Sequence, residues 1–181
     1  IPRPPRSTLF PYPTLFRSLF AHRSLEVAFV DGLHEWTQAV RDVENALRYL
    51  ADTGVIVMHD CNPTSELIAT SCEEYERRRA DGSWPGGSWC GDTFKAVVWL
   101  RAVRPDLRIF VLDCDWGLGI VSRGTPESRL VLSPERVEAL TYADLENQRH
   151  LLLNLRDPAC YPTFLKTILP RPIRESVAYS C

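Results

Sequence analysis

The chain has 181 residues, of which 45% are hydrophobic, and its formal net charge at pH 7 is −2. These values suit one domain with an apolar core, and they exclude a general electrostatic attraction to nucleic acid or to an anionic membrane. No apolar run reaches the roughly 20 residues of a membrane span, and the six cysteines form no CxxC pair, so we expect a soluble cytoplasmic protein with reduced thiols.

The first 18 residues show neither a helical nor a strand period. The stretch TLFPYPTLFRS (8–18) places two prolines between two Leu-Phe pairs. When residues 4–18 are translated back into DNA, they resemble a common sequencing-adapter oligonucleotide. We therefore interpret 1–18 as an adapter-derived artefact without a fold and exclude it from the prediction of structure. We expect a domain over 19–125 and a helical extension over 126–181 that ends in a loose tail.

The interpretable sequence opens with a strand, a helix and a second strand. LEVAFVDG (25–32) is a short apolar run that predicts a buried strand ending at Asp-Gly. Over 35–51 the apolar residues recur every three or four positions, which indicates one apolar helical face. After the helix-breaking Thr53-Gly54, VIVM (55–58) predicts the second strand. This βαβ unit implies two parallel strands joined by a right-handed crossover.

The remaining elements alternate more loosely. We expect helices over 65–79 and 93–103, separated by a Gly- and Trp-rich loop at 81–92. Strands at 108–115 and 117–123 should form a hairpin that turns at Trp116-Gly117, which explains the GxG at 117–119 better than a nucleotide-binding loop does. Three further helices are expected at 134–140, 142–155 and 161–169. The fold class is therefore α/β.

Candidate chemistry follows the first two strands. Asp31 and the pair His59-Asp60 stand where these strands end. If the strands are neighbours, they lie about 4.8 Å apart, so the two carboxylates can converge and hold a hard divalent ion such as Mg²⁺. His34 and His59 add groups that can move protons near neutral pH.

Less specific interpretations stay open for these residues. Either aspartate alone could belong to an ordinary turn. A zinc site from His34, His59 and Cys61 is conceivable, although its spacing matches no usual zinc pattern. In the loop 81–92, Trp84 and Trp89 could line an acceptor pocket or simply pack the loop.

The residues over 27–63 carry a family resemblance. VAFVDGLHEW and VIVMHDCNP resemble the fourth and fifth strands of class I S-adenosylmethionine-dependent methyltransferases, in the group with D-G-x-H and G-G-V-I-x-x-H-D motifs. GDTFKAVVWLR (91–101) and RIFVLDCDWGLGIVSR (108–123) are similar to the next helix and the closing antiparallel hairpin of that group. The resemblance implies the C-terminal part of a Rossmann-like methyltransferase sheet, strands four to seven, with flanking helices and a helical C-terminal extension.

The resemblance also implies roles for individual residues. In relatives that methylate hydroxyl groups, acidic residues at these two strand ends bind Mg²⁺, which holds the acceptor oxygens beside the methyl sulfonium. Carried over, Asp31 and Asp60 are the metal ligands, Asp31 also lies at the cofactor, and His34 or His59 is the general base. His59 stands where relatives can have an acidic ligand, and Cys61 stands where some metal-dependent relatives have Asn.

One part of the family pattern has no counterpart here. Such enzymes hold S-adenosylmethionine on a Gly-rich loop after strand one, whereas the sequence before Leu25 contains neither glycine nor an acidic residue. We therefore expect an N-terminally truncated, inactive fragment of an enzyme that methylates a small-molecule acceptor at oxygen. The alternatives are a non-enzymatic remnant and a metal-dependent hydrolase that uses Asp31, His59 and Asp60. A sheet that lacks its first half would expose an edge, through which the chain could self-associate.

Overall fold

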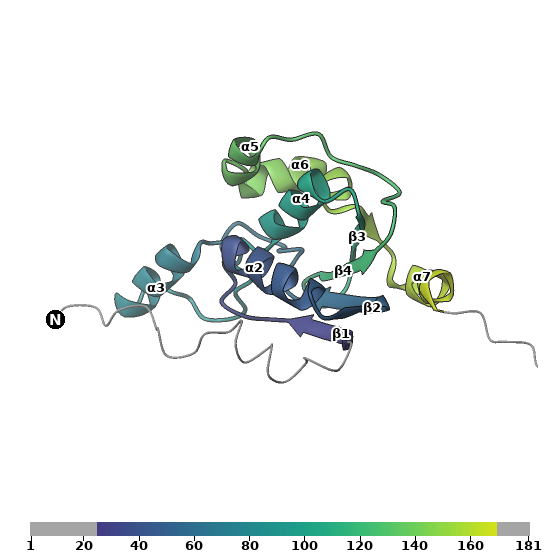
Figure 1. The fold of residues 1–181 in the computed structure, drawn as a ribbon. Helices are drawn as coiled ribbons and strands as arrows, with labels where there is room; N and C mark the ends of the chain where they lie inside the picture. The colour runs from purple at the N-terminus through teal and green to yellow at the C-terminus, as the bar shows by residue number, and fades with distance from the viewer. Residues whose placement is uncertain (1–24, 170–181) are drawn as a thin grey trace, which may run out of the picture.

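The computed structural model describes residues 25–169, which form one mixed sheet with helices on both faces (Figure 1). The sheet has five strands in the order β1-β2-β4-β3-β5. Strand β1 pairs parallel to β2, whereas β4 lies antiparallel to both β2 and β3. The segment interpreted as adapter-derived and the expected loose tail both lie outside the described residues.

The predicted βαβ unit is confirmed. Strand β1 (Leu25–Val30) pairs with β2 (Leu50–Met58), and between them helix α2 (Trp36–Leu47) buries the apolar face expected from its periodicity. Strand β2 begins earlier than predicted, because Leu50 already pairs with Leu25 ahead of a register shift. A Cβ at Gly54 would come within 2.8 Å of the Leu25 carbonyl oxygen. Gly54 therefore permits an irregularity inside the strand, and the prediction that Thr53-Gly54 breaks the helix was wrong.

The middle of the chain departs from the prediction at one helix. Helix α3 (Cys72–Ala80) begins later than expected, because the Ser71 hydroxyl accepts a hydrogen bond from the Glu74 backbone N–H and caps the helix there. Helix α4 (Phe94–Val103) and the hairpin of β3 (Leu107–Leu112) and β4 (Leu118–Arg123) are confirmed. The hairpin inserts β4 between β2 and β3.

The three helices expected near the C-terminus are present, in shorter form. They are α5 (Pro134–Glu138), α6 (Tyr142–Leu153) and α7 (Tyr161–Ile168). Two elements were not predicted: the short strand β5 (Leu155–Arg156), which runs parallel to β3, and a 3₁₀ turn at Pro158–Cys160. Asn154 adopts left-handed backbone angles and ends α6, so the chain turns directly into β5.

The core divides into two layers, one on each face of the sheet. Helices α2, α4 and α6 lie on one face (Figure 1). Helix α7 covers part of the other face, where Phe164 meets Phe110 edge to face. On β1 this second face is open, because Val27 and Phe29 are 65% and 61% exposed. The prediction that this strand is buried was therefore wrong. Among residues 25–169 no helix combines the length and the apolar character needed to cross a membrane.

Candidate functional site

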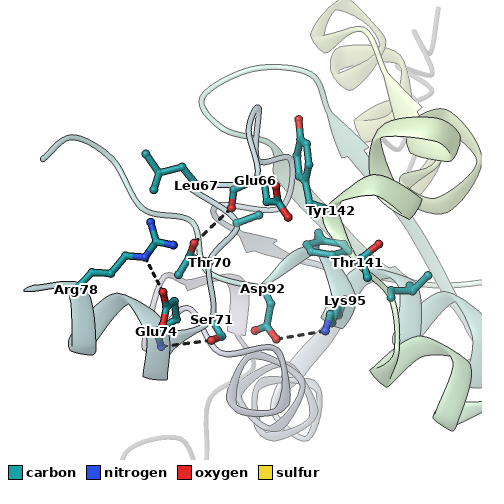
Figure 2. A pocket seen from close by; sticks show the side chains of 13 residues that line it. Glu66, Leu67, Thr70, Ser71, Glu74, Arg78, Asp92, Lys95, Thr141 and Tyr142 are labelled. Carbon is teal, nitrogen blue, oxygen red and sulfur yellow. Dashed lines mark hydrogen bonds and ion pairs between the residues drawn. The ribbon is translucent and has the colours of Figure 1, made fainter. Parts of the chain in front are cut away.

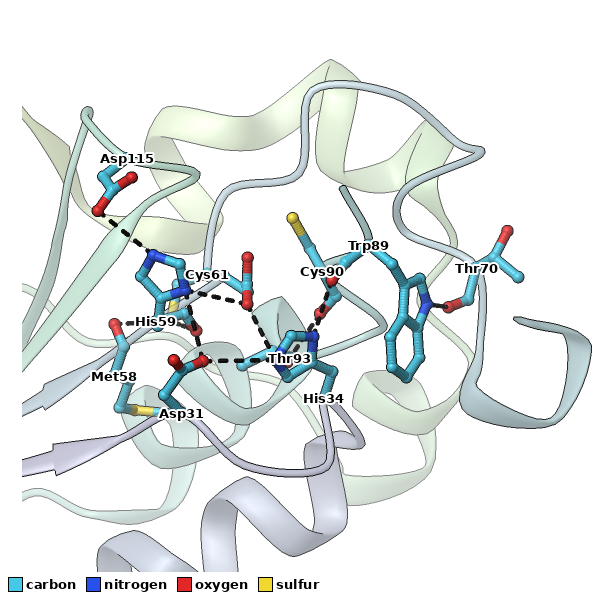
Figure 3. Close-up of polar contacts among 11 residues, drawn as sticks. Asp31, His34, Met58, His59, Cys61, Thr70, Trp89, Cys90, Thr93 and Asp115 are labelled. Atoms are coloured by element: carbon cyan, nitrogen blue, oxygen red, sulfur yellow. Dashed lines mark hydrogen bonds and ion pairs between the residues drawn. The ribbon is translucent and has the colours of Figure 1, made fainter. Parts of the chain in front are cut away.

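Three strands end at the same edge of the sheet, and an aspartate follows each of them. Strand β3 runs in the same direction as β1 and β2, because both β2 and β3 pair antiparallel to β4. Asp31, Asp60 and Asp115 therefore come together beyond the carboxyl ends of these strands, which is where ligands bind in open α/β sheets. Figure 3 shows Asp31 and Asp115 on opposite sides of His59.

The predicted convergence of Asp31 and Asp60 is present, and His34 completes the group. Nε2 of His34 lies 3.1 Å from Oδ2 of Asp60 and 3.4 Å from Oδ1 of Asp31. One potential ligand atom from each of the three side chains lies within 4.8 Å of the others. Two carboxylates and an imidazole at this separation could hold a divalent cation.

His59 lies beside this group and bridges all three carboxylates. Its Nδ1 is 3.0 Å from Oδ2 of Asp60 and 3.5 Å from Oδ1 of Asp31, while its Nε2 is 3.4 Å from Oδ2 of Asp115. Burial disfavours the charged ring, but the negative charge of Asp60, with Asp31 and Asp115, outweighs it and raises the pKa of His59. The aspartates therefore favour the protonated form of His59 more than solvent would.

Asp60 is the buried member of the cluster, with 5% of its surface exposed. A carboxylate buried this deeply needs charged or hydrogen-bonding partners, and His34 and His59 supply them. Burial also raises the pKa of the Cys90 thiol, and the neighbouring Asp60 carboxylate raises it further. Asp60 thus faces one thiol and two imidazoles.

The backbone around the site adopts unusual angles. His34, Asp60, Asp115 and Trp116 all have positive φ, between 47° and 59°. Such a conformation is uncommon in residues with a side chain and costs on the order of 1 kcal/mol each. Conformations of this kind gather at binding and catalytic sites, where the surrounding structure holds them. The concentration at this edge of the sheet therefore supports a functional site.

The two tryptophans of the Gly-rich loop pack the loop. The ring of Trp89 stacks on Tyr75 with centroids 4.0 Å apart and also on His34, at 5.0 Å, while Trp84 meets Tyr75 edge to face. The Trp89 indole N–H donates to the Thr70 carbonyl at 2.7 Å. Trp89 therefore joins the loop to α3 and supports one side of His34 (Figure 3).

Two contributions to the site were missed by the sequence prediction. Asp115 was treated only as part of a hairpin, yet it follows β3, whose carboxyl end lies at the same edge as those of β1 and β2. Its place after an apolar strand was the available signal. Asn62 is the second: it accepts a hydrogen bond from Arg149 of α6 and donates to Asp113 at 2.9 Å. This network fixes the segment after β2, and its partners are too distant in sequence to be read from a motif.

Cys61 does not join the candidate ligands. Its thiol is fully buried and lies near the backbone carbonyls of Met58 and His59, at 3.7 and 3.4 Å. Burial raises the pKa of this thiol. The zinc set of His34, His59 and Cys61 is therefore not assembled. Within residues 25–169 the cysteines form no disulfide with one another.

A pocket of about 520 Å³ opens elsewhere on the molecule, between the segment before α3, the start of α4 and the turn before α6 (Figure 2). Its charged lining residues carry both signs: Glu66, Glu74, Arg78, Asp92 and Lys95. None of the four predicted site residues lines it. A smaller cavity, of about 10 Å³, lies against Asp31, His34 and His59.

The fold is consistent with one class of protein. An α/β structure with this five-stranded mixed sheet is consistent with part of a Rossmann-like methyltransferase domain. Residues 8–61 match the family model described as "Methyltransferase domain". That segment contains α2 and most of the site: Asp31, His34, His59 and Asp60. No curated protein and no solved structure matches the chain.

The family match bears on two of the sequence predictions. A methyltransferase domain implies S-adenosylmethionine as the methyl donor, as the resemblance does. The match begins at residue 8, inside the segment interpreted as adapter-derived. It lends that interpretation no support, and the adapter origin of residues 1–18 stays a prediction.

Proposed function

We propose that this protein is, or derives from, an S-adenosylmethionine-dependent methyltransferase that methylates a small-molecule acceptor at oxygen. In this proposal the described residues correspond to the fourth to seventh strands of the sheet, with their helices. The observation that supports it best is the convergence of Asp31, His34, His59 and Asp60 beyond two parallel strands of the segment that matches the methyltransferase model.

The carboxylates of Asp31 and Asp60 suit a divalent cation. Both are oxygen donors, their ligand atoms lie within 4.8 Å of each other, and Asp31 is partly open to solvent. Mg²⁺ bound there would supply positive charge that stabilises an acceptor oxygen as it loses its proton. Asp31 also lies at the predicted cofactor side of the site, so this side chain would adjoin both the donor and the acceptor.

Two imidazoles are candidates for the group that accepts the acceptor's proton. The Nε2 atom of His59 lies beside Asp115, and its Nδ1 faces Asp60. A carboxylate therefore orients the ring and stabilises its charged form. His34, from the segment between β1 and α2, presents Nε2 to Asp31 and Asp60. In both cases the proposed proton acceptor would lie at the strand ends, where catalysis depends mainly on orientation.

The residues before β1 offer few of the features that bind S-adenosylmethionine. No glycine precedes Gly32 in the sequence, so the close backbone approach of a Gly-rich loop has no counterpart before β1. We therefore expect this chain to be inactive in methyl transfer by itself. Calorimetry with S-adenosylmethionine tests this expectation, and binding with a micromolar dissociation constant would overturn it.

The methyltransferase proposal itself is tested on the protein that the gene encodes. The genomic DNA upstream of the codon for Leu19 would be sequenced, and any longer protein that it encodes would be assayed with methyl-labelled S-adenosylmethionine and a panel of small hydroxylated acceptors. Transfer of label that is lost in Asp60→Ala is expected. No transfer by a folded, cofactor-binding longer protein would overturn the proposal.

The cation proposal can be tested on the present chain. Mg²⁺ binding measured by calorimetry should be lost in Asp31→Ala and in Asp60→Ala. Asp52→Ala is the matched control, because the Asp52 side chain is fully exposed and lies away from the cluster. Absence of Mg²⁺ binding by the unmutated chain would remove Mg²⁺ from the proposed mechanism.

A metal-dependent hydrolase is the second candidate, because Asp31, His59 and Asp60 do converge. Cation-dependent hydrolysis of an activated ester, lost in His59→Ala, would favour it over methyl transfer. A non-enzymatic remnant would show neither activity and would bind no cation at the cluster.

A further inference from the structure

The ring of His34 is held in a single orientation by its Nδ1. This nitrogen lies 2.8 Å from the backbone carbonyl oxygen of Trp89. A carbonyl oxygen can only accept a hydrogen bond, so Nδ1 carries the proton and donates it. Nε2 is then the atom that faces Asp31 and Asp60, and when a cation replaces its proton it offers a lone pair to that cation.

Trp89, which accepts the hydrogen bond from His34, is itself held by several contacts. Trp89 stacks on the His34 ring, and its other contacts, to Tyr75 and to the Thr70 carbonyl, join it to the segment around α3. Gly91 allows the loop to lie directly against the backbone of His34, because a Cβ at this position would overlap the His34 carbonyl oxygen. The loop therefore fixes both the backbone and the ring of His34.

From this arrangement we propose that His34 is a metal ligand, which with Asp31 and Asp60 forms a site selective for a first-row transition ion such as Mn²⁺, Fe²⁺ or Zn²⁺ over Mg²⁺. The inference rests on the proposed function in so far as both place a cation at Asp31 and Asp60. It goes further in assigning His34 to the cation, which leaves His59 as the acid–base group.

The contacts of the two histidines support this division of roles. A histidine that binds metal usually donates its second ring N–H to a backbone carbonyl or a carboxylate, which fixes the tautomer. His34 has this arrangement, with a carbonyl on one side and two carboxylates on the other. His59 has a carboxylate beside each ring nitrogen, and it is not part of the group whose ligand atoms all lie within 4.8 Å of one another.

The donor set also indicates the kind of ion. Mg²⁺ prefers oxygen ligands and retains several waters, whereas an imidazole nitrogen raises the affinity for first-row transition ions. A set of one imidazole and two carboxylates therefore favours Mn²⁺, Fe²⁺ or Zn²⁺. The cavity of about 10 Å³ beside Asp31, His34 and His59 is lined by these same groups, and water-sized space next to the ligands suits a further ligand from solvent.

The test measures which ring nitrogen the metal contacts. With ¹⁵N-labelled histidine in the full chain, long-range ¹H–¹⁵N spectra should show a shift of His34 Nε2 when Zn²⁺ is added to saturation. His150 on α6 is exposed and serves as the internal control that should not shift. A saturated chain whose His34 signal stays unchanged would overturn the inference, and so would a chain that binds no Zn²⁺ or Mn²⁺.

A matched pair of variants tests selectivity. His34→Asn removes the imidazole, and asparagine tolerates the left-handed backbone at this position better than most residues. Loss of an outer partner of a metal ligand already weakens binding by about 10- to 100-fold, so His34→Asn should weaken Zn²⁺ binding by at least about tenfold while it affects Mg²⁺ binding less. His150→Asn should change neither. Equal Zn²⁺ affinity in a folded His34→Asn variant would contradict the assignment.

These outcomes separate the inference from the proposed function. A chain that binds Mg²⁺ while His34 stays unshifted by Zn²⁺ overturns the His34 assignment and leaves methyl transfer intact. A longer protein without methyl transfer, in which Zn²⁺ still shifts His34, overturns the proposed function and supports the metal site.

Discussion

The carbonyl oxygen of His34 lies where a side chain at Gly91 would have to go, so these two residues are in direct backbone contact. The contact brings the loop that carries Trp89 onto the segment after β1, and Trp89 lies beside His34 (Figure 3). A glycine without catalytic atoms therefore helps to set the geometry of the cluster.

Gly91→Ala should displace His34 and weaken cation binding. The new Cβ would overlap backbone rather than a flexible side chain, and φ at this position is +63°, so the variant combines steric conflict with an unfavourable backbone conformation. We expect a loss of about 2 kcal/mol or more in the free energy of unfolding, measured by urea denaturation, and a loss of Zn²⁺ affinity, measured by calorimetry.

Gly86→Ala is the matched control for this change. Gly86 has φ of +88°, but no atom lies within 4 Å of its added Cβ. Gly86→Ala should therefore lower the free energy of unfolding by only about 1 kcal/mol, the cost of a left-handed backbone at alanine, and leave cation affinity unchanged. Equal effects of the two variants would show that the contact between Gly91 and His34 does not matter.

A buried arginine joins α4 to the end of α6. Arg101 is 5% exposed and donates to the carbonyls of Leu151 and Leu152 and to the hydroxyl of Ser128. Burial lowers the pKa of Arg101 to about 10. Arg101→Met should leave these carbonyls without a donor, at a cost of about 1–3 kcal/mol in the free energy of unfolding. Arg41→Met, at an exposed position of α2, should change the free energy of unfolding by no more than about 0.5 kcal/mol. An equally small change for Arg101→Met would contradict the role assigned to Arg101.

The sequence was most informative where one local pattern dominates. The apolar periodicity of α2 and the two flanking apolar runs predicted the βαβ unit, and the rule for strand ends then brought Asp31 and Asp60 together. Asp115 was missed because its place depends on β3 running parallel to β2, which follows only from the insertion of β4 between them. The tautomer of His34 depends on a carbonyl in a distant loop, and no spacing of residue types encodes such a contact.

Thiol chemistry offers a check on the packing beneath the site. Cys61 and Cys90 are fully buried, and burial raises the pKa of both thiols, so the reactive thiolate is scarce as well as inaccessible. Alkylation of the native chain at pH 8, followed by mass spectrometry of peptides, should leave both unmodified while the partly exposed Cys160 is labelled. Both buried thiols should react after denaturation in urea. Rapid native labelling of Cys61 would contradict the packing of β2 against β4.

Self-association through β1 is the last prediction, and it follows from the open face of the sheet. Within residues 25–169 strand β1 pairs only with β2, and Val27 and Phe29 on its open face are largely exposed. An unpaired strand edge beside exposed apolar side chains favours pairing with another chain. Burial of one phenylalanine stabilises an interface by about 1.5–3 kcal/mol, so Phe29→Lys should weaken association at least about tenfold in light scattering coupled to size-exclusion chromatography. Val131→Lys replaces another exposed apolar residue, at 97% exposure and away from β1, and should leave association unchanged. A monodisperse monomer of the unmutated chain at high concentration would show that this edge is protected.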